Sequence, residues 1–247
     1  MQGRQTDVRF RRRIWLLRPA LELGVVVAIA SVAGVLLLDA QRSSGHAWVD
    51  GGARWMADLH GQPWLNHSMA WVTSFGAEIF LFGAFSALVV WSYRSRGRTW
   101  GRFSLLVMGG ALALDNIVKP LVARPRPDID QLVNGRGASF PSGHVVATTA
   151  LLFALAFYIS SGTGLRTRNR IWVVAIAGVT LMAASRVYLG VHWPTDVIAG
   201  VCIGAAWTYL CARSQKIGPR RASSFSLASA LRTSQSRSVS PTAWRHS

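Results

Sequence analysis

The stretch PSGHVVATTALLFALAFYIS, residues 141–160, joins a polar tetrapeptide directly to a long apolar run. The run has roughly 17 residues without a charge, which is the lower limit for a helix that spans a bilayer. A Gly-containing turn at a helix N-terminus presents free backbone N–H groups and the positive end of the helix dipole, and both bind anions. The stretch therefore predicts a membrane helix whose first turn holds an anion.

Apolar runs of similar length recur along the chain, which is 51% hydrophobic and only 15% charged. This composition is too apolar for an ordinary soluble domain. The expected membrane spans are residues 20–39, 71–92, 103–122, 144–160, 171–189 and 196–212. We therefore predict an all-α integral membrane protein, with six transmembrane helices forming one bundle over residues 20–212. An even number of spans places both termini on the same side of the membrane.

The positive charge is distributed unevenly between the two sides of this bundle. Of the 27 Lys and Arg residues, 20 lie in segments 1–19, 93–102, 161–170 and 211–247, which share one side. The positive-inside rule assigns that side to the cytoplasm. Because the arginines cluster between spans, the net charge of +17 is explained by topology and not by binding of nucleic acid. Residues 1–19 are predicted to be a basic cytoplasmic arm, and 213–247 a disordered cytoplasmic tail rich in Ser and Arg.

Two further polar clusters lie at the opposite, outer ends of predicted helices. One runs from Lys119 to Arg126-Pro127, with Pro120 expected to end the third helix just after Lys119. The other contains Ser185-Arg186, His192 and Asp196. With residues 141–144, these clusters supply three cations, two histidines, a carboxylate and a turn suited to anions. The combination favours a pocket on the outer face that holds and attacks a phosphate.

Taken singly, these residues also have structural interpretations. Lys119 and Arg186 suit interfacial anchors whose charged ends reach the headgroups, and Asp196 suits an N-cap of the sixth span. His144 alone would be an ordinary interfacial histidine. Asp115 can pair with Lys119 on one helix face or be a satisfied intramembrane carboxylate. For the acids Glu22 and Glu78, structural pairing is favoured over catalysis.

The other candidate groups indicate no metal site and no disulfide. A short interfacial helix is expected near Trp55–His60, in the long outer loop. The histidines of that loop have no standard ligand spacing, and the cysteines lie on different turns of one predicted helix. These residues are His46, His60, His67, Cys202 and Cys211.

Taken together, the clusters resemble the three signature motifs of the type-2 phosphatidic acid phosphatase superfamily, which also contains the vanadium haloperoxidases. The matching elements are Lys119-x6-Arg126-Pro127, Pro141-Ser142-Gly143-His144 and Ser185-Arg186-x5-His192. Order, spacing and helix context agree with the family, and no motif position departs from it. The resemblance covers residues 119–196 directly and about 20–212 through the topology.

The resemblance implies a role for each motif residue. His192 would be the nucleophile that forms a phosphohistidine, with Asp196 accepting a hydrogen bond from its other ring nitrogen. His144 would protonate the leaving oxygen and then activate water. The phosphate-binding groups would be Lys119, Arg126, Ser142, Gly143 and Arg186. No metal or cofactor is required in this scheme.

The resemblance further implies a lipid phosphatase in the bacterial inner (plasma) membrane, with its site facing away from the cytoplasm. Expected substrates are polyprenyl diphosphates such as undecaprenyl diphosphate, phosphatidic acid or phosphatidylglycerophosphate, taken from the outer leaflet. A phosphotransferase of the same fold is one alternative. A non-catalytic lipid-binding or transport protein is another, and it would keep its function without His192. A haloperoxidase is disfavoured because those relatives are soluble.

Overall fold

The computed structural model describes residues 51–217, which form seven helices and no strand. The helices are α2 (Gly51–Ala57), α3 (Pro63–Ser74), α4 (Glu78–Arg96), α5 (Arg98–Val122), α6 (Gly143–Ser160), α7 (Leu165–Tyr188) and α8 (Pro194–Ser214). This agrees with the predicted all-α class. The arm 1–19, the first predicted span 20–39 and the predicted tail from residue 218 onward lie outside the described residues.

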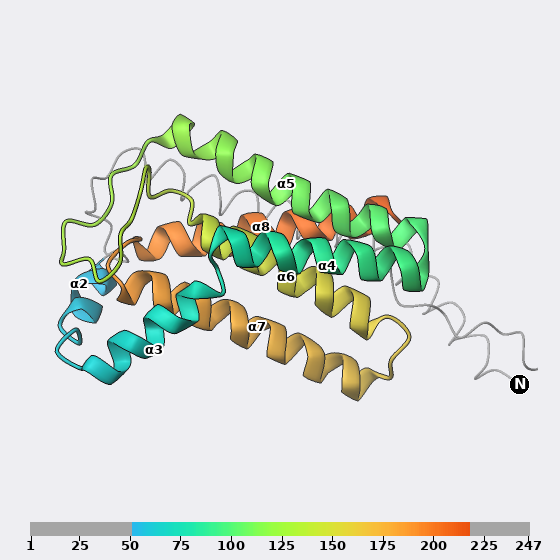
Figure 1. Cartoon of the computed structure of the whole chain (residues 1–247), viewed down its shortest axis with the longest axis horizontal. Helices are drawn as coiled ribbons and strands as arrows, with labels where there is room; N and C mark the ends of the chain where they lie inside the picture. Colours follow the sequence, from blue (N-terminus) through green and yellow to red (C-terminus); the bar gives the residue numbers. More distant parts are fainter. Residues whose placement is uncertain (1–50, 218–247) are drawn as a thin grey trace, which may run out of the picture.

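The long helices α4 to α8 run lengthwise through the molecule, and α6 lies at the centre (Figure 1). It packs against α5, α7 and α8. Of the residues in its 18-residue apolar stretch, 56% are buried, compared with 11% for the corresponding stretch of α5. Helices α2 and α3, the loop 123–142 and the α7–α8 connection gather at one end of the bundle (Figure 1). The α4–α5 and α6–α7 turns lie at the other end.

Within the described residues, α5, α6, α7 and α8 are each long and apolar enough to cross a membrane. They correspond to four of the predicted spans. The predicted span 71–92 is not one straight helix, because α3 and α4 are separate helices bent by 45°, and they are long and apolar enough to cross a membrane only as a pair. The bend packs closely against the bundle. A Cβ atom on Gly76 would lie 2.6 Å from the His144 ring, so the chain turns where a side chain has no room.

Helix α5 does not stop at Pro120 as predicted but continues to Val122. A proline removes only its own N–H from the helix ladder, so the turn that follows it can still form. Ala123 then ends the helix in the left-handed conformation (φ 48°), and its N–H bonds to the Lys119 carbonyl at 2.9 Å. The helix thus ends at Val122, the last residue of the predicted span 103–122.

The closest helix contact lies between α6 and α8 and depends on glycine. A Cβ atom on Gly204 would lie 2.6 Å from the Val146 carbonyl oxygen, and one on Gly200 would lie 3.1 Å from the Ser142 carbonyl oxygen. Small residues allow two backbones to approach in this way inside a membrane. The contact fixes α8, which begins beside His192, against the first turn of α6.

We expect Gly204→Ala to destabilise the protein, because the added methyl group forces the two backbones apart. Overpacking of this kind costs about 1–3 kcal/mol, which thermal unfolding in detergent would report as a lower Tm. Gly83→Ala is the matched control, since it also adds a methyl group within a helix but has nothing within 4 Å. Equal Tm values for the two variants would contradict this account of the contact.

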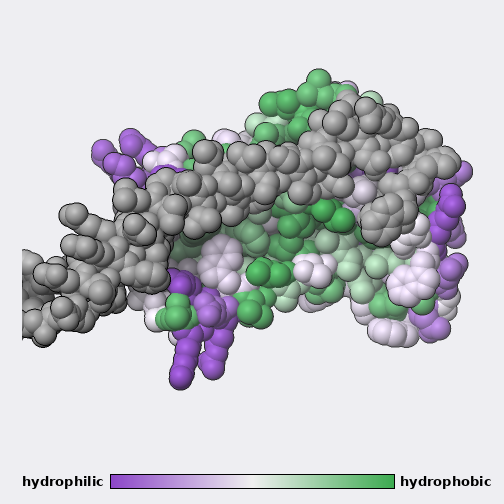
Figure 2. Space-filling view, turned by 180° about the vertical axis from the view of Figure 1, so that it is seen from behind, coloured by the Kyte–Doolittle hydropathy of each residue, from purple (hydrophilic) through white to green (hydrophobic). Residues whose placement is uncertain are grey.

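The molecular surface is apolar where a bilayer core would lie. Figure 2 shows hydrophobic residues across the middle of one face and hydrophilic residues towards its ends. Large exposed apolar side chains include Ile79, Phe82, Leu105, Ile117 and Val174. An apolar surface of this extent indicates contact with lipid or with another protein.

Candidate active site

The polar tetrapeptide predicted to bind an anion does form the start of α6. Ser142 is the residue before the helix, and its backbone N–H donates to the Asp196 carbonyl at 3.2 Å. This bond joins the start of α6 to the start of α8. The Ser142 Oγ is buried and makes no hydrogen bond to the described residues. A hydroxyl without a partner at a helix N-terminus leaves a donor available for a bound anion.

His192 lies in the turn between α7 and α8, almost fully buried. Its Nδ1 is 2.8 Å from the Ser139 carbonyl oxygen. Because a carbonyl oxygen only accepts hydrogen bonds, Nδ1 carries the proton and the lone pair of the neutral ring is on Nε2. Nε2 lies 3.5 Å from Nη1 of Arg126. The nitrogen able to attack therefore faces a cation.

Asp196 contacts His192 differently from the expectation. Its Oδ2 is 3.6 Å from Nδ1 of His192, beyond hydrogen-bond distance, and accepts the backbone N–H of Trp193 at 2.9 Å. The residue preceding α8 is Trp193, so Asp196 is not the N-cap but supports it from the first turn. Asp196 therefore acts on His192 through its charge and by holding the turn, while the Ser139 carbonyl holds the ring.

Arg124 belongs to this cluster, although no motif singles it out in the sequence. Its Nη1 donates to Asp196 Oδ1 at 2.8 Å and to Thr195 Oγ1 at 2.6 Å, and its guanidinium lies over the Trp193 ring. Both members of the Arg124–Asp196 ion pair are fully buried. Breaking such a pair leaves an uncompensated charge. Arg124 thus anchors the carboxylate that lies beside His192.

Two of the predicted phosphate-binding cations lie near His192. Arg126 is held by three carbonyl groups, those of Gly137, Val191 and Arg136. Arg186 is only 5% exposed; its Nη1 donates to Thr73 Oγ1 at 2.6 Å, and its buried Nε makes no hydrogen bond to the described residues. Fixed guanidinium groups with donors to spare are suited to bind phosphoryl oxygens.

Lys119 is paired differently, with its Nζ 2.6 Å from Asp115 Oδ2 one helical turn earlier. This confirms the pairing alternative for Asp115. Both residues line a cavity of about 520 Å³ between α4, α5 and α6, together with Gly143 and His144. The positive charges of Arg186, Lys119 and Arg126 all act on His144. His144 thus faces the cavity and lies within electrostatic reach of the cations near His192.

The cavity has one polar and one apolar part. Asp115, Lys119 and His144 line the first, next to the start of α6. The second is lined by Leu81, Phe85, Met108, Ala111, Leu112 and Ala147. A space with this division fits a molecule that has a charged head and an apolar tail.

The surroundings of His192 keep its ring neutral. Burial lowers the pKa of His192 to about 4, and the nearby Arg186 and Arg126 also lower it, while Asp196 opposes the change. Burial likewise lowers the pKa of Arg126, and Asp196 opposes that shift. Near neutral pH the Nε2 lone pair of His192 is therefore free to attack an electrophile.

The lowered pKa of His192 predicts that the acid side of the pH–rate profile is shifted to an unusually low pH. The nucleophile is lost only when its ring is protonated, so we expect the rate to fall as the pH passes through about 4 and not 6.5. Single-turnover formation of the phosphoenzyme from p-nitrophenyl phosphate would show it, because this leaving group needs no proton. An acid limb at pH 6.5 or above would contradict the assigned environment.

The remaining histidines have structural contacts. His60 lies 2.5 Å from the Tyr188 carbonyl oxygen, and Nδ1 of His67 lies 2.7 Å from that of Pro63. His46 lies outside the described residues. Within residues 51–217, no three His, Cys, Asp or Glu side chains are grouped so that they could hold a metal ion. The short helix expected near Trp55 is present as α2, somewhat earlier than predicted.

Two characterised proteins are similar to this chain in sequence. Phosphatidylglycerophosphatase B of Bacillus subtilis (strain 168) is 36% identical over 152 residues, which cover 60% of this chain and 74% of that protein. An undecaprenyl-diphosphatase of Sulfolobus acidocaldarius is 28% identical over 163 residues, covering 63% and 73%.

Two solved structures are also similar to this chain in fold. The crystal structure of a transmembrane PAP2 type phosphatidylglycerolphosphate phosphatase from Bacillus subtilis matches 81% of this chain and 98% of its own, with a TM-score of 0.65 and 27% identity. Aquifex aeolicus LpxE shares the fold at a TM-score of 0.56 and 23% identity, covering 68% of this chain and 96% of its own. The PAP2 superfamily model matches residues 100–217, and the chain therefore belongs to the PAP2 superfamily as a multi-pass membrane protein.

Proposed function

We propose that this protein is a lipid phosphatase that removes a terminal phosphate through a phosphohistidine on His192. The observation that carries the proposal is the arrangement of this ring. Its Nδ1 is held by the Ser139 carbonyl, and its Nε2 lies against Arg126 within reach of the charge on Arg186. A cavity with a polar and an apolar part begins at His144. These features together suit a phosphate head and a lipid tail.

In the first step, Nε2 of His192 attacks phosphorus and the bond between phosphorus and the leaving oxygen breaks. His144 gives its proton to that oxygen, and the lipid leaves as the alcohol. In the second step, His144 takes a proton from water, and the hydroxide attacks the phosphohistidine. Inorganic phosphate is released, and both histidines return to their starting protonation states.

The fixed positive groups stabilise the charge that develops during both steps. Arg126 and Arg186 are held by protein contacts before any substrate binds, so little reorganisation is needed when the transition state forms. The Ser142 hydroxyl and the N–H of Gly143 add neutral donors at the start of α6. Lys119 completes the set once the phosphate draws its ammonium group from Asp115.

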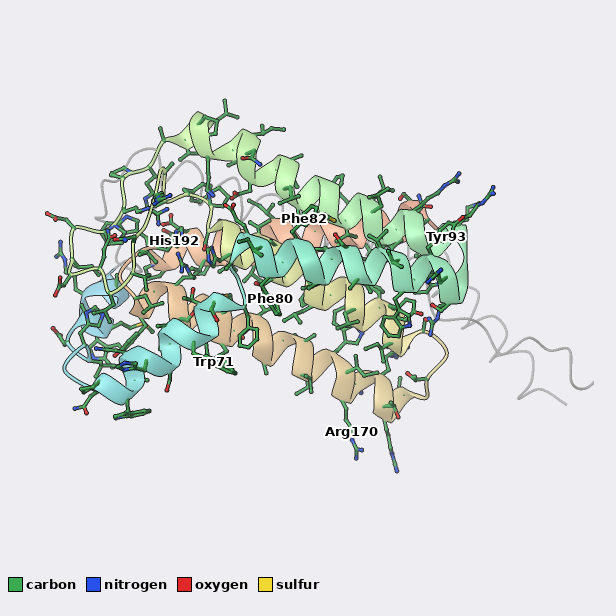
Figure 3. The ribbon with its side chains drawn as sticks, viewed as in Figure 1. Trp71, Phe80, Phe82, Tyr93, Arg170 and His192 are labelled. Atoms are coloured by element: carbon green, nitrogen blue, oxygen red, sulfur yellow. The ribbon has the colours of Figure 1, made fainter. Side chains whose placement is uncertain are left out.

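The distribution of charge supports a location of the site on the outer face. His192 lies at the end of the bundle opposite Tyr93 and Arg170 (Figure 3). The turns at that opposite end carry seven arginines: Arg94, Arg96, Arg98, Arg102, Arg166, Arg168 and Arg170. The positive-inside rule places such turns in the cytoplasm. We therefore assign the site to the outer face of a bacterial plasma membrane, in a six-span protein whose two termini are both cytoplasmic.

Phosphate release by the purified protein in detergent tests this function. The panel should contain phosphatidic acid, phosphatidylglycerophosphate and a polyprenyl diphosphate, because the relatives carry names from more than one of these classes. Release is expected without an added acceptor and in the presence of EDTA. Release only with a hydroxyl acceptor would make the protein a phosphotransferase. A strict need for Mg²⁺ would contradict the metal-free mechanism, and no release from any member would contradict the function.

A further inference from the structure

The cavity beside His144 is lined by two acidic residues, Glu78 and Asp115, that the mechanism above does not use. Glu78 begins α4 and Asp115 lies in α5, so the acids face the cavity from two helices. Asp115 is close to the reacting groups, because a Cβ atom on Gly143 would lie 2.7 Å from its carboxylate. Gly143 directly precedes His144. Asp115 therefore borders the place where the leaving group must lie, and exposed Glu78 lines the same cavity from α4.

The direction of the reaction identifies this cavity as the site of the leaving group. In phosphoryl transfer the attacking atom and the leaving oxygen lie roughly in line, on opposite sides of phosphorus. His192 attacks from its own pocket and does not line the cavity, whereas His144, which protonates the leaving oxygen, does. Whatever is attached to the leaving oxygen must therefore extend into the cavity.

The carboxylate of Asp115 is only half satisfied. Lys119 donates to Oδ2 at 2.6 Å, whereas Oδ1 is buried and makes no hydrogen bond to the described residues. A buried acceptor of this kind needs a donor. An alcohol provides one as its hydroxyl group forms. A second anion beside the same carboxylates adds electrostatic repulsion that an uncharged alcohol does not.

From this arrangement we infer that Asp115, with Glu78, selects lipid phosphomonoesters over lipid diphosphates. When a monoester is cleaved, the group that leaves into the cavity is an uncharged alcohol oxygen. When a diphosphate is cleaved, the leaving group is itself a phosphate, placed beside two carboxylates. This inference rests on the proposed function and narrows its substrate class. Asp115 acts here as a specificity-determining residue.

Farnesyl phosphate and farnesyl diphosphate form the sharpest test, because they share one tail and differ by one phosphate. The kcat/KM for the monophosphate is expected to exceed that for the diphosphate by about tenfold or more, which corresponds to one unfavourable charge contact. Asp115→Asn should lower this ratio by about tenfold, and Glu78→Gln should lower it less. Asp58→Asn, which removes an exposed acid of the loop after α2, should leave the ratio unchanged.

The outcomes separate this inference from the proposed function. Phosphate release without a preference for the monophosphate, or an equal ratio in Asp115→Asn and Asp58→Asn, overturns the inference and leaves the phosphatase intact. If Asp115→Asn does not fold, the ratio in the unmodified protein and in Glu78→Gln decides. Release from neither compound, nor from any lipid of the panel, overturns the inference together with the function on which it rests.

Discussion

Replacing His192 with alanine is expected to lower phosphate release by about 10⁵-fold, comparable to the loss of an enzymatic nucleophile elsewhere. The imidazole forms the covalent bond to phosphorus, and the structure offers no other neutral nitrogen held between a backbone carbonyl and a guanidinium within the described residues. Phosphate release by the purified variant, measured on the best lipid of the panel, gives the result.

The matched control for this substitution is His67→Ala. His67 is exposed and contacts only the Pro63 carbonyl among the described residues, so its loss should leave the rate within about twofold and the Tm nearly unchanged. The comparison is valid only if the purified His192→Ala variant is folded. Full activity in folded His192→Ala would contradict the mechanism, and unchanged biological function would favour a lipid-binding or transport protein.

The second large effect is expected for His144→Ala, and it should depend on the leaving group. A general acid contributes about 10²–10⁴-fold, so release from an alkyl phosphate such as a lipid phosphomonoester should fall by about that factor. p-Nitrophenolate leaves without a proton. Formation of the phosphoenzyme from p-nitrophenyl phosphate should therefore change much less, and phosphohistidine should accumulate because water is no longer activated.

Stopped-flow release of p-nitrophenolate separates the two roles of His144. We expect a burst of one equivalent per active protein, followed by a slow steady state. Equal losses of the burst rate for the nitrophenyl and alkyl substrates would mean that His144 only positions the phosphate. In that case the general acid must be sought elsewhere in the cavity wall.

Those parts of the site that consist of side chains at fixed sequence spacing could be predicted from the sequence. The start of α6, the Arg126 and Arg186 guanidinium groups and the His192 turn were all expected near one another, and their charges do interact. Helices α5 to α8 were predictable because long uncharged runs leave few alternatives in a membrane. These features depend on local sequence and on helix direction alone.

The contacts that could not be predicted depend on tertiary geometry. Ser139 holds the His192 ring with its backbone carbonyl, which every residue type possesses, so no side chain signals it. Arg124 reaches Asp196 across more than seventy residues of chain, and its buried position distinguishes it from an interfacial arginine only in three dimensions.

The bend between α3 and α4 was missed for a related reason. Residues 71–92 are predominantly apolar, with Glu78 as the one charged residue, and hydropathy does not detect a break in a segment of such composition. The break occurs at Gly76, where the chain packs against His144 and Met182. Its cause therefore lies in residues remote in sequence.

The most direct test of the central claim is detection of the covalent intermediate. His144→Ala would be mixed with ³²P-labelled p-nitrophenyl phosphate, whose leaving group needs no proton, then quenched in alkali to preserve phosphohistidine and digested. Mass spectrometry of the peptides would locate the label. We expect one alkali-stable, acid-labile phosphate on His192, absent from His192→Ala. Phosphate release by the unmodified protein with no label on His192, or with the label on another residue, would contradict it.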